Sequence, residues 1–78
     1  MKTVEYQGYT IKSFPQQQLR SGQWTIHLKI FWKDHDATTM KVFTDDTPYA
    51  TEEEADLHGI TYGQRIIDGK VPGLAVTE

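Results

Sequence analysis

The sequence predicts a small α+β domain, in which a three-stranded antiparallel sheet is followed by one long helix packed on one face and by a short C-terminal tail. The first observation is the alternation from Trp24 to Trp32, where every second residue is large and apolar, as in a strand with one buried face. The second is Thr51 followed by three glutamates, which is typical of a helix N-terminus. The third is Gly69 followed by Pro72, which end a helix and prevent its resumption.

Size and composition indicate a single domain over residues 1–78. A chain of this length buries only about 60% of the surface that its unfolded form exposes, so the core is thin. Cysteine is absent, which excludes disulfides and thiolate metal ligands. The first residues lack the apolar segment of a signal peptide, and no run approaches the roughly 20 apolar residues of a membrane span. We therefore expect a soluble, cytoplasmic protein with no membrane contact.

The first predicted strand covers residues 9–14, which alternate between apolar and polar side chains until Pro15 ends the strand. Residues 4–6 either form a separate short strand or lead into a bulge at Gly8. Residues 16–22 contain three glutamines and end in Ser-Gly, which predicts a polar hairpin loop.

The second and third predicted strands cover residues 23–33 and 38–44. Between them, Asp34-His35-Asp36 supplies turn-forming residues. Residues 45–48 predict a loop, because Pro48 cannot donate a backbone hydrogen bond and restricts the residue before it.

The helix is predicted from Glu52 to about Ile67, a length of about 24 Å. Its apolar stripe includes Gly59 and Gly63, which lie one turn apart and allow a close approach to the sheet, beneath Trp24 or Trp32. The predicted core consists of Tyr9, Ile11, Trp24, Ile26, Leu28, Ile30, Trp32, Met40, Val42, Ala55, Tyr62 and Ile66.

The opposite face of the sheet carries the most specific functional pattern, since each predicted strand has a Lys-x-Phe step on the side away from the apolar run. One helix covers only one face, so these lysines and phenylalanines are expected on an open surface. The candidate binding residues are Lys12, Phe14, His27, Lys29, Phe31, Lys41 and Phe43.

Two functions fit this surface. A third possibility is that the lysine stems partly shield the phenylalanine rings and the surface has no binding role. The favoured function is a non-enzymatic interaction module that binds an unidentified partner protein or a second copy. The alternative is single-stranded nucleic-acid binding, in which bases stack on the rings and lysines meet phosphates.

The charge distribution is uneven. Residues 1–44 carry six basic and three acidic groups, a net +3, whereas residues 45–78 carry two basic and eight acidic groups, a net −6. If the first part is sheet and the second mainly helix, the molecule has a mildly basic side and an acidic side. The simpler interpretation, which we favour, is that these charges only solvate the surface.

Metal and catalytic chemistry find little support in the sequence. Asp34, His35 and Asp36, even with His27 or His58, match no recognised metal spacing, so no metal or other cofactor is expected. No nucleophile has a matching histidine, and no glycine-rich phosphate loop is present. We therefore expect no enzymatic activity and assign no catalytic residues.

Four segments resemble a family of short, uncharacterised bacterial β-β-β-α domains. They are residues 6–11 (YQGYTI), 22–24 (GQW), 49–55 (YATEEEA) and 63–69 (GQRIIDG), and together they extend over nearly the whole chain. The resemblance implies a compact β-β-β-α fold and, because the family has no established activity, no catalytic residues. The element order also resembles that of a double-stranded-RNA-binding domain lacking its first helix, which is an analogy of fold alone.

Overall fold

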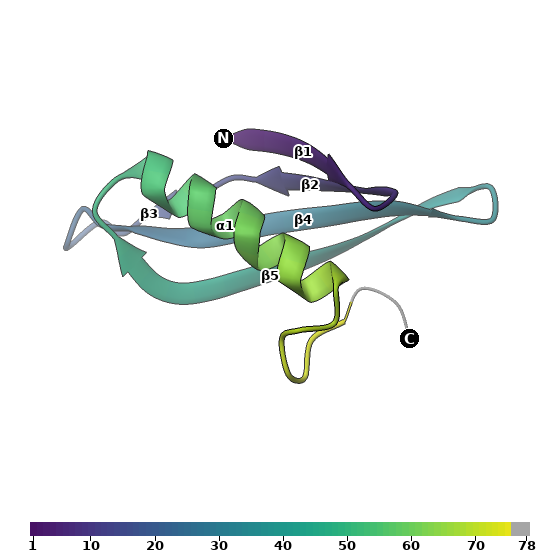
Figure 1. Ribbon diagram of the computed structural model, residues 1–78. Helices are drawn as coiled ribbons and strands as arrows, with labels where there is room; N and C mark the ends of the chain where they lie inside the picture. Colours follow the sequence, from purple (N-terminus) through teal and green to yellow (C-terminus); the bar gives the residue numbers. More distant parts are fainter. Residues whose placement is uncertain (76–78) are drawn as a thin grey trace.

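The computed structural model of the chain describes residues 1–75, which form a five-stranded antiparallel sheet with one helix lying across it (Figure 1). The elements are β1 (Lys2–Tyr6), β2 (Tyr9–Ser13), β3 (Gln16–Gln17), β4 (Trp24–Asp34), β5 (Ala37–Tyr49) and α1 (Glu52–Ile67). The predicted α+β class with an antiparallel sheet and one helix is confirmed, but the predicted number of three strands is wrong.

The first additional strand, β1, pairs with β2 through a two-residue turn. Tyr6 lies opposite Tyr9, and the turn residues Gln7 and Gly8 have φ angles of 54° and 83°. Turns with two consecutive positive φ angles match the right-handed twist of the flanking strands. Glycine at the second turn position adopts a positive φ without steric cost. Gly8 therefore forms a hairpin turn, and residues 4–6 belong to a separate strand.

The second additional strand, β3, continues β2 along the same edge of β4. The Phe14 N–H donates to the His27 carbonyl at 2.9 Å, and Gln16 then pairs with Thr25. Pro15 removes one donor from this edge without ending the pairing. The predicted loop at residues 16–22 is therefore shorter than expected.

The edge strand β5 is also longer than predicted, because residues 45–48 belong to it. Ile26 pairs with Asp45 and Trp24 with Tyr49, so β5 bulges between these two pairs. The Asp45 carboxylate accepts the Thr47 N–H at 2.8 Å within the bulge. The predicted loop was wrong, since the bulge accommodates the proline inside the strand.

The register of β4 with β5 decides which side chains face the helix. Leu28 pairs with Phe43 and Ile30 pairs with Lys41. Because paired residues point to the same side of a sheet, Phe43 and Lys41 lie on the helix side. The prediction that they lie on the opposite face is wrong.

Met40 and Val42 consequently lie on the face away from the helix, with 43% and 53% of their surface exposed, whereas Phe43 is only 8% exposed. The prediction that Met40 and Val42 belong to the core is therefore wrong, because the register turns both side chains away from the helix. A register change of one residue moves every side chain of a strand to the other face.

The core lies between α1 and the sheet. Its buried apolar cluster is Ile11, Ile26, Leu28, Ile30, Phe43, Ile60 and Ile66. Trp32 is half-buried against this cluster and packs on Tyr9 with ring centroids 5.9 Å apart. Trp24 is half-buried but does not belong to the cluster, so it contributes less to the core than its size suggests.

Helix α1 spans Glu52–Ile67, as the sequence predicts. The Thr51 hydroxyl accepts the Glu54 N–H at 3.1 Å and so satisfies one of the free donors of the first turn. Past the C-terminus, Gly69 has a φ of +74° and its N–H donates to the Ile66 carbonyl at 3.1 Å. The predicted glycine stop is therefore confirmed.

The two helix glycines do allow close packing, but on β2 and β4 rather than beneath a tryptophan. A Cβ placed on Gly63 would lie 3.0 Å from Ile11 Cγ2, and one on Gly59 would lie 3.2 Å from Ser13 Oγ and 3.5 Å from Ile26 Cγ2. The helix backbone thus rests directly on these side chains.

The structure describes the predicted C-terminal tail as far as Ala75. Leu74 packs against the buried cluster, and the Lys41 ammonium donates to the Ala75 carbonyl at 3.2 Å. Val76 lies outside the described residues. The helix in residues 1–75 is not long and apolar enough to cross a membrane.

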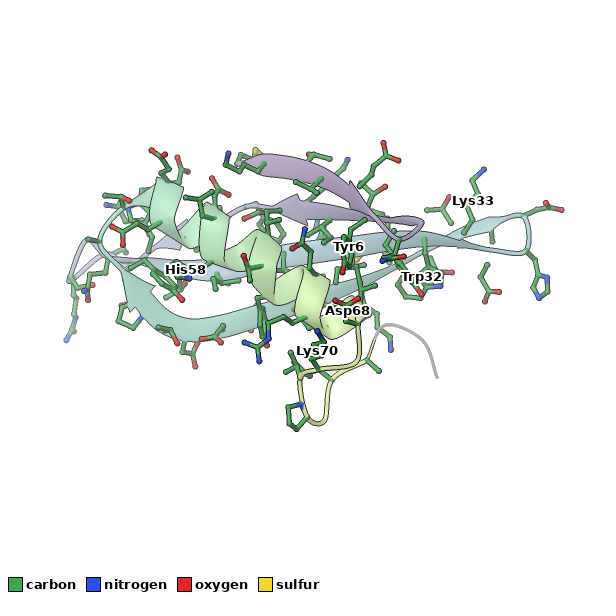
Figure 2. The ribbon with its side chains drawn as sticks, in the orientation of Figure 1. Tyr6, Trp32, Lys33, His58, Asp68 and Lys70 are labelled. Atoms are coloured by element: carbon green, nitrogen blue, oxygen red, sulfur yellow. The ribbon has the colours of Figure 1, made fainter. Side chains whose placement is uncertain are left out.

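Strand β1 is tied to the C-terminus of α1 by the Tyr6 hydroxyl, which donates to the Asp68 carboxylate at 2.7 Å (Figure 2). This hydrogen bond raises the pKa of Tyr6 above its ordinary value of 10.0, because ionisation removes the donor beside an existing negative charge. The contact therefore stabilises the fold below about pH 10 and is lost as the pH rises through the raised pKa.

We expect replacement of Asp68 by asparagine to lower the pKa of Tyr6 towards that of free tyrosine. The measurement is an NMR titration of the Tyr6 ring signals in both proteins. Tyr9, which follows on the next strand, serves as the internal control. An unchanged Tyr6 pKa in the variant contradicts the contact.

Candidate interaction face

The sheet has one face that none of the residues 1–75 covers, because α1 packs on the opposite side (Figure 1). We call this surface the outer face. The register of β2, β4 and β5 places on it Lys12, Phe14, His27, Lys29, Phe31, Met40 and Val42.

Five of the seven predicted binding residues are among them, and Lys41 and Phe43 are not. Lys41 reaches the Ala75 carbonyl on the helix side, and Phe43 is buried beneath α1. Met40 and Val42 occupy the corresponding positions of β5 on the outer face. The surface is thus less basic and more aliphatic than predicted.

Two lysines lie at the centre of the outer face, directly opposite each other on β2 and β4. The Lys12 ammonium is 5.2 Å from the centroid of the Phe31 ring, and the Lys29 ammonium is 5.3 Å from that of Phe14. Each contact contributes about 0.5–1 kcal/mol at an exposed site. Neither lysine has a carboxylate within 4.0 Å in the described part of the chain. The two positive charges therefore remain available to a partner.

One end of the outer face is hollowed beside the β1–β2 turn. The cavity has a volume of about 220 Å³ and is lined by Gly8, Thr10, Phe31, Trp32, Lys33 and Thr38. Its size suits one apolar side chain of a partner better than a whole ligand, since ligand sites usually occupy about 300 Å³ or more. Glu5 of β1, opposite Thr10, is the nearby acidic residue that the register places on this face.

The predicted acidic and histidine clusters form no metal site in the described residues. His35 lies 3.8 Å from Asp34 at the β4–β5 turn, with both side chains exposed. Over residues 1–75, no group of three potential ligands gathers in a geometry that could hold an ion.

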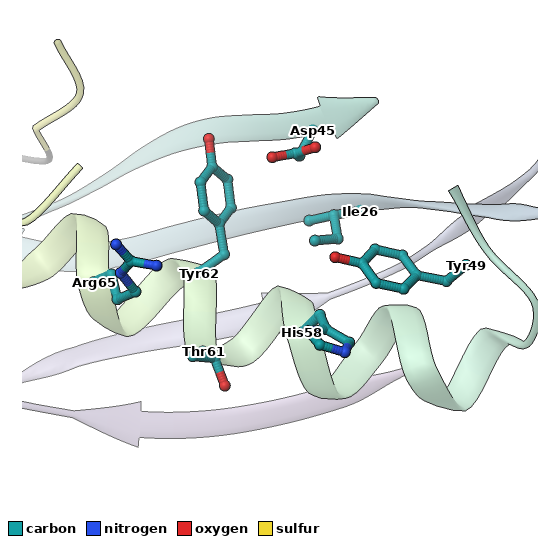
Figure 3. A pocket seen from close by; sticks show the side chains of 7 residues that line it. All are labelled: Ile26, Asp45, Tyr49, His58, Thr61, Tyr62 and Arg65. Atoms are coloured by element: carbon teal, nitrogen blue, oxygen red, sulfur yellow. The ribbon is translucent and has the colours of Figure 1, made fainter. Parts of the chain in front are cut away.

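A second cavity lies on the helix side, between β5 and α1 (Figure 3). It has a volume of about 190 Å³ and is lined by Ile26, Asp45, Tyr49, His58, Thr61, Tyr62 and Arg65. The Tyr49 ring stacks on His58 with centroids 4.6 Å apart and planes 18° from parallel. Sequence reasoning missed this cluster, because it joins the predicted loop at residues 45–48 and the residue after it to the exposed helix flank. Its other two members, Ile26 and Tyr62, were predicted only as core residues.

The polar groups of this cleft influence one another. Burial, and next the negative charge of Asp45, raises the pKa of both Tyr49 and Tyr62. The Thr47 N–H that Asp45 accepts lowers the pKa of that carboxyl, so Asp45 is ionised at neutral pH. The two tyrosines therefore stay neutral beside a fixed negative charge.

Comparison with protein-family models, curated proteins and solved structures finds no match for this chain. The resemblance to short bacterial domains stays a prediction.

Proposed function

We propose that the protein is a non-enzymatic interaction module that binds a partner protein through the outer face. The observation that carries this proposal is the exposure of Met40, which lies opposite Phe31, and of Val42, which lies opposite Lys29, on a surface that no described segment covers. A contiguous exposed apolar patch is typical of an interaction site. A cytoplasmic location remains part of the proposal, and the lack of cysteine is compatible with a reducing compartment.

The chemistry of the face favours a partner segment that is both apolar and acidic. Carboxylates would meet Lys12 and Lys29, and an apolar side chain would enter the hollow beside Phe31. A second copy of the chain fits less well, because a two-fold axis through the centre would bring the two lysine pairs together.

Single-stranded nucleic acid is the second candidate, favoured by the same two lysines and by two phenylalanine rings. This candidate has less support than the sequence alone suggests, since Met40 and Val42 lie on the outer face in place of Lys41 and Phe43. If Lys12 and Lys29 each contact one phosphate, a plot of the logarithm of the binding constant against the logarithm of the salt concentration should have a slope of about −1.4.

We expect random displayed peptides selected on the protein to be enriched in Asp or Glu near an aromatic or leucine residue. The double variant Lys12→Glu, Lys29→Glu should bind the selected peptides about tenfold more weakly, because it places negative charges opposite their carboxylates. The matched control is Lys70→Glu, which makes the same kind of charge change on an exposed residue after α1. Fluorescence anisotropy measures the affinities.

Three outcomes of this experiment contradict the proposal. One is enrichment of basic peptides, and another is equal loss of affinity in the Lys70→Glu control. The third is binding of labelled oligonucleotides, with the expected salt slope, more tightly than any selected peptide. Sedimentation over a concentration series tests the second copy, and concentration-dependent dimerisation that Val42→Asp abolishes would assign the face to self-association.

A further inference from the structure

The cleft between β5 and α1 is distinct from the outer face and combines one carboxylate with two aromatic rings. Asp45 borders it on β5, and Tyr49 and Tyr62 border it from β5 and α1 (Figure 3). No cation lies within 4.0 Å of the Asp45 carboxylate in the part of the chain that the structure describes. In Figure 3 the Tyr62 ring stands between Asp45 and the Arg65 side chain.

The hydrogen bonds within the cleft leave its polar groups free for a ligand. The Asp45 carboxylate accepts the Thr47 N–H at 2.8 Å through Oδ1, and its hydrogen bonds within the described residues come from Thr47 alone. The same part of the chain offers no hydrogen-bond partner to the Tyr49 or Tyr62 hydroxyl. Tyr49 is kept in place by stacking on His58. The site is therefore formed before any ligand enters.

We propose that this cleft binds a small alkylammonium cation. Aromatic rings attract a cation through their negative faces, and alkylated ammonium groups are recognised by such rings together with a carboxylate. Asp45 neutralises the charge, and Tyr49 and Tyr62 contact the methyl groups. The volume of about 190 Å³ accommodates a group of this size but not a larger ligand.

The surroundings of the cleft support a cation over other ligands. The lining itself holds one carboxylate, Asp45, and one guanidinium, Arg65, while the segment that supplies most of it, residues 45–78, carries two basic against eight acidic groups, a net −6. A metal ion is disfavoured, because Asp45 is the one carboxylate in the lining and metal sites need several converging ligands. An anion would have to approach Asp45, which is ionised.

The test is a titration of the ¹⁵N-labelled protein, residues 1–78, with tetramethylammonium chloride, followed by amide chemical shifts. We expect saturable shifts confined to the cleft, with a dissociation constant in the millimolar range. Sodium chloride at equal ionic strength controls for screening. Tert-butanol, which has a similar size and no charge, controls for apolar contact. Saturable shifts of the same residues with tert-butanol, or none with tetramethylammonium beyond those of sodium chloride, would overturn the proposal.

Three variants sharpen this test. Asp45→Asn keeps the oxygen that accepts the Thr47 N–H but removes the charge, and should weaken binding about fivefold. The matched control Asp46→Asn alters the neighbouring residue, which does not line the cleft, and should leave the affinity unchanged. Arg65→Gln removes the positive charge behind Tyr62 and should strengthen binding about twofold.

Each variant outcome decides for or against a cation site. Equal affinity of Asp45→Asn and Asp46→Asn overturns the role of the carboxylate, and weaker binding of tetramethylammonium by Arg65→Gln contradicts a site whose affinity is set by the net charge of its lining. Thermal unfolding of each variant excludes loss of fold as the cause of weaker binding.

Discussion

Replacement of Leu28 by alanine is expected to lower the free energy of unfolding by about 3 kcal/mol. Leu28 has no exposed surface, pairs with Phe43 on β5 and lies within 3.8 Å of the Cβ position of Gly59. Three secondary-structure elements, β4, β5 and α1, thus meet at this side chain, so the cavity left by alanine has little freedom to collapse. Urea unfolding monitored by tryptophan fluorescence measures the change.

The matched control is Val42→Ala on the outer face. Val42 belongs to β5 and pairs with Lys29, the residue that follows Leu28 on β4. Val42 is 53% exposed, so its truncation should cost less than about 1 kcal/mol. Equal costs of the two substitutions would mean that both faces of the sheet are buried. A larger cost at Val42 would mean that the register of β5 is shifted by one residue.

Replacement of Gly63 by valine is expected to lower the free energy of unfolding by about 3 kcal/mol, because overpacking forces α1 away from β2. The new Cβ alone would lie 3.0 Å from Ile11 Cγ2 and 3.2 Å from its Cδ1. Helix propensity predicts the opposite sign, since valine is better than glycine inside a helix by roughly 0.4 kcal/mol. The sign of the measured change therefore decides between packing and propensity.

A graded series strengthens this experiment. Gly63→Ala should fall between the natural protein and the valine variant, since it adds the Cβ contact without the branched γ carbons. Thr61→Val changes an exposed position of the same helix and should have little effect. A valine variant as stable as the natural protein would show that the helix does not rest on Ile11.

The local elements of the fold were predictable because their signals are short-range. The Thr51 cap and the Gly69 stop gave the bounds of α1, and the alternation within β4 gave the buried side of that strand. The pairing of β2 with β4 also agreed with its alternation, as Ile11 lies opposite Ile30. These predictions needed only information within each segment.

The length of one turn explains the wrong placement of β5. In the structure only His35 and Asp36 form the turn, with Asp34 opposite Ala37 and His35 at a φ of 59°. A three-residue turn that includes Asp34 would place Met40 opposite Ile30 and bring Met40 into the core. The apolar residues of β5 alternate on both faces, so composition alone did not distinguish the two registers.

The candidate site was likewise predictable where it depends on a single strand, and not where it depends on the register of β5. The five candidate residues on and just after β2 and on β4 lie on the outer face as expected, because those strands have one clearly apolar side. Met40 and Val42 were not predicted on the outer face, because the predicted register of β5 was wrong by one residue. The cleft near Asp45 was missed because it depends on how a bulged strand meets a helix, which no short segment encodes.

The division of the sheet into a buried and an open face supports every proposal made for the outer face. The most direct measurement is relaxation of side-chain methyl signals by a soluble paramagnetic probe. We expect strong enhancement for Met40 and Val42 and almost none for Leu28 and Ile30. Met40 and Val42 methyls as protected as those of Leu28 would contradict an open outer face, and with it the docking surface.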